Sequence, residues 1–249
     1  FQGHFREVVE KLTHVIKLAQ SLDEHQTLAL ARHVCSMAFH AMGNGEEARI
    51  HAIAGLEAAE RLHNSVFLVR GLLNNASLAM LRGEWIIAQD FIDRALAESP
   101  SAPASLALAT MLNLQVGNIE QSSEYFEQTL EQVPDILHGA GFERTIAIMM
   151  MIPLFARVSG ATDRVDAAET VAKEILSIPS SSKISMIWAR AGLVLVAIQR
   201  SDEESAIELY SSLKPERGTQ FLWPAFCADR ILGLLAQTMG NLDASETHF

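Results

Sequence analysis

Apolar residues recur at intervals of three and four positions along most of this 249-residue chain. The first clear example spans residues 5–20, where the apolar positions are Phe5, Val8, Val9, Leu12, Val15, Ile16 and Ala19. This spacing places these side chains on one face of an α-helix. Alternating runs are short, and the Asn44-Gly45 pair, a common hairpin turn, stands between two helical patterns. The pattern therefore predicts an all-α chain built of helices and turns.

The segments between the helices repeat. Residues 83–88 match residues 117–122, and the glycines that begin these two segments are 34 positions apart. The same turn returns at residues 240–245. Looser copies begin at Gly43, at Gly160 and at Ser201, where serine replaces the glycine. A period of this length is typical of proteins built from stacked helical hairpins.

Each copy has the chemistry of a junction between two helices. The glycine ends one helix in the left-handed conformation, and the polar residue after it caps the start of the next helix. A small side chain follows, where two antiparallel helices must approach closely: Ala48, Ala88, Ser122, Ala167, Ala206 and Ser245. Four positions further on, a larger apolar residue is expected to fill the space beside the next pair: Ile92, Phe126 and Phe249. Prolines are expected to close three of the second helices: Pro100, Pro134 and Pro179.

These features resemble those of the tetratricopeptide-repeat family over essentially the whole chain. In the helix before the last turn, Leu232-Gly233 followed by Ala236 matches a further element of that repeat. The resemblance implies a right-handed α-α superhelix of about six antiparallel helix pairs, with residues 4–249 forming a single array. First helices would line a concave face and second helices would lie outside.

Two positions depart from the family pattern. Thr129 stands where the corresponding copy has Ala95. Pro153 falls inside a predicted helix. Because proline removes a backbone donor and clashes with the preceding turn, we expect it to kink that helix or to shift its pairing.

The two ends of the sequence favour a segment taken from a longer protein. The chain begins with Phe1-Gln2-Gly3 and not with methionine. These three residues are typical of the remnant that a cleaved protease tag leaves, so they are excluded from the fold prediction. The helix over residues 5–20 reads as a second helix whose partner would lie upstream. A repeat array normally ends in a polar capping helix, and the sequence shows none at either end.

Charge and composition narrow the classes of function. The net charge is −11 and no basic cluster is present, which argues against nucleic-acid binding by this segment. No continuous apolar run reaches the roughly 18 to 20 residues of a membrane span. The two cysteines, Cys35 and Cys227, are too few for a disulfide framework, so we expect buried thiols and a cytoplasmic location.

Motifs that carry catalysis or bind cofactors are missing from the sequence. It contains no phosphate-binding loop, no Gly-x-Gly-x-x-Gly, no Gly-x-Ser-x-Gly and no His-Glu-x-x-His, so we expect neither an enzyme nor a cofactor. The candidate metal ligands are His33, Cys35, His40 and His51, which lie in one predicted hairpin. His33 and His40 are two turns apart, roughly 10 Å along the helix axis, which favours no metal site.

Three consecutive methionines, Met149-Met150-Met151, allow two interpretations. The favoured one is a buried helix filled with adaptable side chains. The alternative is a soft binding surface, because methionine repacks easily around varied apolar partners.

The resemblance also implies which residues face the concave groove. These are the positions about thirteen, ten, six and three before each turn glycine: Leu30, His33, Met37 and His40; Arg70, Leu73, Ser77 and Met80; Ala104, Ala107, Met111 and Leu114; Cys227, Arg230, Leu234 and Gln237. They include no carboxylate and only two arginines, whereas the second helices carry many acids. The groove therefore suits an apolar helix, an extended peptide or a small uncharged ligand better than a carboxylate-bearing peptide.

Function follows from the resemblance as an expectation. The chain would be a non-catalytic binding module, acting as sensor or scaffold in a bacterial multidomain signalling or transcriptional regulator. Residues 210–213 and 229–242 are similar to stretches of the repeat sensors in bacterial signal-transduction ATPases, which include maltose-activator-type regulators and ATPase-linked nucleotide cyclases. The alternative is a free-standing peptide receptor of the quorum-sensing repeat-regulator type.

Overall fold

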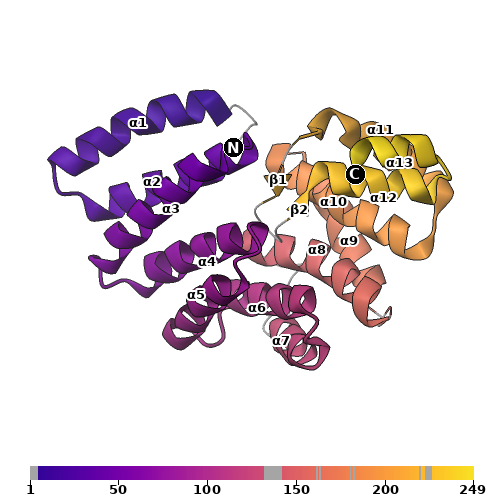
Figure 1. The fold of residues 1–249 in the computed structure, drawn as a ribbon, viewed down its shortest axis with the longest axis horizontal. Coiled ribbons are helices and arrows are strands. Elements are labelled where there is room, and N and C mark those ends of the chain that lie inside the picture. Colours follow the sequence, from indigo (N-terminus) through magenta and orange to yellow (C-terminus); the bar gives the residue numbers. More distant parts are fainter. Residues whose placement is uncertain are drawn as a thin grey trace. The chain divides into compact units, whose positions relative to one another are not determined.

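The computed structural model describes residues 5–131, 142–160, 162, 164–179, 181, 183–218, 220–221 and 226–249, without the side chains of 142–150, 183–184, 220–221 and 226. Helices dominate these ranges (Figure 1). Their bounds are α1 Phe5–Ser21, α2 His25–Ala41, α3 Gly45–Glu60, α4 Ser65–Leu81, α5 Trp85–Glu98, α6 Pro103–Val116, α7 Ile119–Glu131, α8 Phe142–Ser159, α9 Val165–Ser177, α10 Lys183–Arg200, α11 Glu203–Leu213, α12 Ala228–Thr238 and α13 Leu242–His248. The predicted all-α fold is confirmed.

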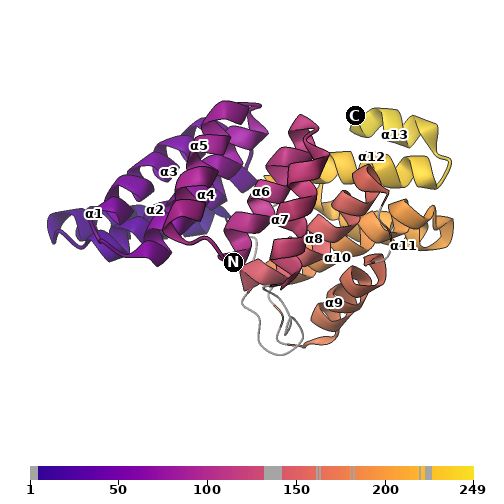
Figure 2. The ribbon, with the colours of Figure 1, turned by 90° about the horizontal axis from the view of Figure 1, so that it is seen from below.

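Contacts divide the chain into two compact units, an N-terminal unit (His4–Gln132) and a C-terminal unit (Val133–Phe249). In the N-terminal unit, α1 packs on α2, and three antiparallel pairs follow: α2 with α3, α4 with α5, and α6 with α7 (Figure 2). In the C-terminal unit the pairs are α8 with α9, α10 with α11, and α12 with α13. Each unit is thus a stack of helical hairpins, and the six predicted pairs are present.

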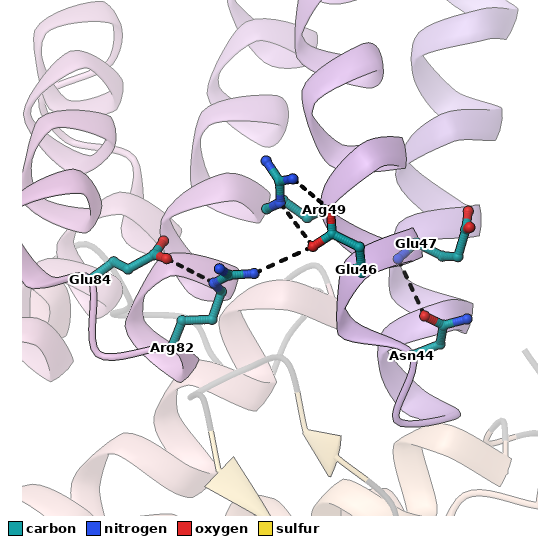
Figure 3. Close-up of polar contacts among 6 residues, drawn as sticks. All are labelled: Asn44, Glu46, Glu47, Arg49, Arg82 and Glu84. Carbon is teal, nitrogen blue, oxygen red and sulfur yellow. Dashed lines mark hydrogen bonds and ion pairs between the residues drawn. The ribbon is translucent and has the colours of Figure 1, made fainter.

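The turns have the predicted geometry. The glycines at the five glycine turns have φ between +70° and +83°, and Ser201 has φ of +54°. At Gly43, Gly83, Gly117, Ser201 and Gly240, the N–H of the next residue donates to a carbonyl five positions earlier, as from Asn44 to Phe39 at 2.9 Å. The Asn44 side chain then accepts a hydrogen bond from the Glu47 N–H at 3.3 Å, which caps α3 (Figure 3). These bonds satisfy backbone groups that helix ends otherwise leave unpaired.

Small residues lie where paired helices approach. Ala48, Ala88, Ser122, Ala206 and Ser245 are all buried, as predicted. The assignment of Ala167 is wrong, because Ala167 is exposed and its neighbour Ala168 is buried in its place. The connection after Gly160 is longer than the other turns, so counting from the glycine misses the position. Counting three residues from the first residue of α9 finds it.

Larger residues near these contacts follow the prediction with one exception. Ile92 and Phe126 are buried, whereas Phe249 is 66% exposed. The Phe249 ring lies against Gly233 of its own hairpin, where an added Cβ would approach Phe249 Cζ to 2.8 Å. Phe249 therefore packs within its own pair rather than filling the space beside a further one.

The two departures from the repeat pattern have different outcomes. Thr129 is buried like Ala95, because its hydroxyl donates to the Tyr125 carbonyl of its own helix at 2.7 Å. Helix α8 contains Pro153 and continues to Ser159. A kink at Pro153 stays a prediction.

Helices α4 and α6 are buried on all sides over part of their length. Ten consecutive residues of each are buried, from Gly71 to Met80 and from Ser105 to Leu114. Several of these residues are polar, and they bond to their own helix: Ser77 to the Leu73 carbonyl, Thr110 to Leu106 and Asn113 to Ala109, each at 2.9 Å. Such bonds remove much of the cost of burying a polar group.

A short irregular region between α11 and α12 was not predicted. It contains the 3-10 helix η1 (Lys214–Glu216) and an antiparallel pair of two-residue strands, β1 (Gln220–Phe221) and β2 (Phe226–Cys227). Two residues per strand are too few to produce an alternating pattern in the sequence.

Candidate functional site

The structure places the predicted groove residues in different environments. Those that are buried are His40, Leu73, Ser77, Met80, Ala107, Met111 and Leu114. Those that are partly buried are His33, Met37, Arg70, Ala104, Cys227 and Leu234, whereas Leu30, Arg230 and Gln237 are exposed. A partner that binds this structure without rearrangement therefore has access to Leu30, His33, Met37, Arg70 and Ala104 in the N-terminal unit.

Three of the predicted groove residues come together in one small pocket between α2, α3 and α4, named here the α2–α4 pocket. Its lining is Ala29, Leu30, His33, Ala52, Gly55, Phe67, Arg70, Gly71 and Asn74. The enclosed space is about 10 Å³, enough for about one water molecule. The whole pocket lies inside the N-terminal unit.

Two helical glycines bring the walls of the α2–α4 pocket together. A Cβ on Gly55 would lie 3.2 Å from Arg32 Cβ, and a Cβ on Gly71 would lie 3.1 Å from Leu56 Cδ1. These distances are shorter than ordinary contacts between carbon atoms. Glycine at both positions lets α3 approach α2, and α4 approach α3, without displacing these neighbours. Neither glycine belongs to a turn, so the repeat pattern did not single them out.

Two residues that line the pocket, Asn74 and His33, each have a buried polar atom with unused hydrogen-bonding capacity. Asn74 is only 2% exposed, and its Nδ2 donates to Ser36 Oγ at 3.1 Å. Its Oδ1 has no partner among the described residues, nor has Nδ1 of His33. An unsatisfied buried polar atom costs about 1–3 kcal/mol, so these two atoms reduce the stability of the packed helices.

The charge state of the pocket is fixed by burial. Burial and, to a smaller extent, the nearby Arg70 guanidinium lower the pKa of His33 to about 4. His33 is therefore neutral at pH 7, with one ring nitrogen as donor and the other as acceptor. Arg70 supplies the positive charge beside it.

Asn74 was missed by the sequence reasoning, although it stands one turn after Arg70 on α4. The groove positions were counted at fixed offsets from the turn glycine, and Asn74 falls between two of them. Its signal in the sequence was the pair Asn74-Asn75 inside an otherwise apolar helix. Asn75 has a structural role, since its Nδ2 donates to the Gly71 and Ala52 carbonyls at 2.9 and 3.1 Å.

A second polar cluster lies in the C-terminal unit. Tyr210 Oη lies 2.9 Å from His248 Nε2, and His248 Nδ1 lies 3.4 Å from Asp229 Oδ1. The Asp229 carboxylate also accepts from Arg217 Nε at 3.1 Å and from the Gly218 N–H at 2.7 Å. These bonds tie α11, η1, α12 and α13 together, so the cluster has a structural role.

The two cysteines lie in different surroundings. Burial raises the pKa of Cys35 to about 11, with Arg32 acting weakly in the opposite direction. Cys35 is therefore a protonated core thiol at pH 7, whereas Cys227 is partly exposed rather than buried as expected. Within the described ranges, no three His, Cys, Asp or Glu side chains are close enough to hold a metal ion.

The second helices of the N-terminal unit carry both ion pairs and apolar side chains. Arg82 bonds to Glu84 at 2.8 Å and reaches Glu46 at 3.6 Å, while Glu46 also pairs with Arg49 at 2.6 Å (Figure 3). Ile86, next to this network in sequence, is 87% exposed. The face predicted as acidic and solvated is thus mixed in character.

The triple methionine can be placed only in part. Met151 is buried, which agrees with the favoured interpretation of a filled core. The side chains of Met149 and Met150 lie outside the described residues.

No described helix is both long enough and apolar enough to cross a bilayer.

Comparison with known proteins bears on the fold alone. No protein-family model matches the sequence, and no curated protein matches it. Among solved structures, the chain is similar to a tetratricopeptide-repeat protein from Parabacteroides merdae, with 14% sequence identity and a TM-score of 0.50. The similarity covers 100% of this chain and 91% of that one. Together with the helix pairs and their turns, it shows that this chain has the tetratricopeptide-repeat-like fold.

Proposed function

We propose that the chain is a non-catalytic protein- or peptide-binding module, and that the α2–α4 pocket and the side chains around it contact the partner. The observation that carries the proposal is the pocket itself. It brings together Leu30, His33 and Arg70, three of the residues that the resemblance assigns to a binding groove. Helical-repeat folds present such surfaces to other proteins.

The lining favours a neutral segment as partner. Leu30 and Phe67 supply apolar area, His33 is uncharged, and Arg70 provides one positive charge. A site for a carboxylate-bearing peptide usually gathers several cationic and amide side chains. An apolar helix, an extended peptide or a small uncharged ligand fits this lining better.

The test is selection of binders from a displayed peptide library on the full-length chain, followed by affinity measurements on substituted chains. Leu30 is 43% exposed, so Leu30→Glu places a charge at the pocket without filling a core position. We expect it to weaken binding at least tenfold. Leu73 and Met111 are unsuitable for this test because they are buried, and a charge there would unfold the chain.

The matched control is Ile86→Glu, the same introduction of a charge at an exposed apolar residue of a second helix. It should leave the affinity unchanged. If Ile86→Glu abolishes binding and Leu30→Glu does not, the partner binds the second helices and the proposal is wrong.

For the setting of this module we propose a sensor or scaffold in a cytoplasmic bacterial multidomain signalling or transcriptional regulator. The support is the similarity of residues 210–213 and 229–242 to sensor arrays of signal-transduction ATPases. The genomic reading frame that encodes the chain tests this directly. A nucleotide-binding loop and an output domain in that frame would support it, whereas a single short regulator would favour the quorum-sensing type of receptor.

A further inference from the structure

We propose that the exposed face formed by α3 and α5 is a docking surface for a basic amphipathic helix of a partner protein. Its apolar part, named here the isoleucine face, consists of Ile50 and Ile53 on α3 and of Ile86 and Ile87 on α5. None of these residues lines the α2–α4 pocket, so this surface is separate from the one in the proposed function.

Two ion pairs show how α3 and α5 lie side by side. Arg82 Nη1 lies 3.6 Å from Glu46 Oε2 at the start of α3 (Figure 3), and Arg94 Nη2 lies 2.9 Å from Glu60 Oε1 at its end. The members of these pairs are 36 and 34 positions apart in the sequence. The earlier arginine meets the earlier glutamate, so the two helices run in the same direction and are bridged at both ends.

The same two separations place the isoleucines opposite one another. Ile86 comes 36 positions after Ile50, and Ile87 comes 34 positions after Ile53. Ile53 and Ile87 each precede a member of the second ion pair by seven residues, or two helical turns, so they share its faces of the helices. Ile50 follows a member of the first pair by four residues, or one turn. The four isoleucines therefore form one cluster between the two ion pairs.

All four side chains are exposed. The exposed fraction is 87% for Ile86, 50% for Ile87, 46% for Ile50 and 39% for Ile53. Single exposed apolar residues are ordinary on a protein surface, whereas a group of them marks an interaction surface. Ile207 is an example of the ordinary kind, because it stands alone as a large exposed apolar residue among the described residues of α11.

Negative charge surrounds the isoleucine face. The second helices α3, α5 and α7 carry eleven carboxylates, two arginines and no lysine, whereas the first helices α2, α4 and α6 carry no carboxylate. The charge extends from α5 to α7, since burial and the nearby carboxylates of Asp93 and Glu124 raise the pKa of Tyr125 on α7. A partner therefore meets apolar side chains within an acidic surround.

This charge selects the kind of occupant. A second copy of the chain would bring the same acidic helices against these, and like charges at close range repel. A membrane surface rich in anionic lipid would be repelled for the same reason. A helix with apolar residues along one face and lysines or arginines beside them covers the isoleucines and pairs with the surrounding carboxylates.

The experiment titrates a synthetic peptide into the full-length chain at about 0.15 M salt, followed by isothermal titration calorimetry. The peptide is a helix of about four turns with leucines on one face and lysines on the other. A second peptide has the same composition in an order that spreads the leucines around the helix. We expect the amphipathic order to bind about tenfold more tightly. The methyl resonances of the four isoleucines in two-dimensional NMR should shift on binding.

Variants then locate the site. Ile50→Gln combined with Ile86→Gln should weaken binding of the amphipathic peptide about tenfold, and both positions are exposed, so the fold is kept. Ile207→Gln is the matched control, because it also removes an exposed isoleucine from a helix that carries several glutamates. It should leave the affinity unchanged. Leu30→Glu, at the α2–α4 pocket, should also leave it unchanged, which separates this surface from the pocket.

Equal affinity for the two lysine peptides would show that charge alone attracts them and would overturn the proposal. Equally tight binding of a peptide with glutamates in place of the lysines would overturn it as well. Sedimentation equilibrium of the chain and of the Ile50→Gln, Ile86→Gln variant tests a second copy, and sedimentation with phosphatidylserine vesicles tests a lipid surface. Self-association or vesicle binding that the variant loses would assign the isoleucine face to that occupant and contradict the proposal.

Discussion

Ser201 occupies a turn position that five other junctions fill with glycine. Its φ of +54° lies in the left-handed region, which side chains with a Cβ adopt at a cost of about 1 kcal/mol. Two hydrogen bonds at this junction offset the cost of the left-handed conformation. The Asp202 N–H donates to the Ala197 carbonyl at 2.9 Å, and Asp202 Oδ1 accepts from the Ser205 N–H at 3.1 Å.

We predict that Ser201→Gly stabilises the C-terminal unit. Relief of the left-handed strain outweighs the added freedom of the unfolded chain, for a net gain of about 0.5 kcal/mol. Urea unfolding followed by circular dichroism measures it. Gly240→Ala is the reverse control, since its φ is +70° and an added Cβ would touch nothing within 4 Å. It should cost about 1 kcal/mol, and a change of the same sign in both variants would contradict the argument.

Glycine is required at position 71 for a different reason. The Gly71 backbone is helical, and a neighbouring side chain leaves too little space for a Cβ. We predict that Gly71→Ala destabilises the N-terminal unit by about 1–3 kcal/mol, since the new Cβ would lie 3.1 Å from Leu56 Cδ1 and 3.3 Å from Leu56 Cα. Urea unfolding midpoints measure the loss. Gly45→Ala is the control, because Gly45 begins α3 with open space around it. An equal loss in both variants would show that packing on Leu56 is not the cause.

At the scale of the element, α2 buries two histidines with lowered pKa values. Burial lowers the pKa of His40 to about 4, and His33 has a similar value. His40 Nε2 has no hydrogen-bond partner among the described residues. No described group around His40 stabilises its charged imidazolium form, so protonation of His40 destabilises the packing of α2.

We therefore predict that the N-terminal unit loses stability as the pH falls from about 6.5 to about 4. Between these values the unfolded histidines bind protons that the folded ones do not, so stability is fully present above about 6.5 and declines below it. The loss reaches up to about 3 kcal/mol for His40. Urea midpoints at several pH values measure it. His40→Met should reduce this dependence and leave a remainder from His33, whose pKa is also about 4, and from His51, whose pKa burial lowers.

The positions of most helices could be predicted from the sequence, because each turn depends on a few residues next to one another in the chain. A glycine and the polar residue after it determine where one helix ends and the next begins, and the helices followed that code even at Ser201. The prediction of Ala167 as the small residue was wrong because the position was counted from Gly160, and the connection from Gly160 to α9 is longer than the other turns. The two short strands between α11 and α12 could not be predicted, because two residues per strand produce no alternating pattern in the sequence.

The candidate site was less predictable because it depends on distances between helices. Leu30, His33 and Arg70 follow from repeat offsets, but the pocket exists only because Gly55 and Gly71 lack side chains at two close approaches. The same offsets also selected Leu73 and Met111, which are buried. An offset gives the direction of a side chain on its helix, and it does not show what covers that side chain.

At the scale of the whole molecule, the hairpins within each unit pack mainly on their neighbours in sequence. Ion pairs cross between successive hairpins, as from Arg94 to Glu60 at 2.9 Å and from Arg200 to Glu169 at 2.6 Å. Arg94 and Glu60 are about half exposed, and such pairs contribute at most about 1 kcal/mol. Burial of apolar side chains therefore contributes most of the cohesion within each unit.

We predict that the fragment His4–Gln132 folds without the rest of the chain, because its contacts form one compact unit. It should keep its helical circular dichroism spectrum and unfold cooperatively in urea. A shorter fragment that ends at Ala102 is the control. It lacks α6, which packs on both α4 and α5, and should be markedly less stable. Non-cooperative unfolding of His4–Gln132 would contradict the division into units.

The polar residues inside α4 and α6 have a consequence for evolution. Ser77, Thr110 and Asn113 each bond to a carbonyl of their own helix, so they need no matching partner on a neighbouring element. Exchange of such a residue for alanine or another small side chain requires no simultaneous change elsewhere. Selection can then accept substitutions one at a time, and two arrays of this kind can diverge far in sequence while their helix pairs stay in place.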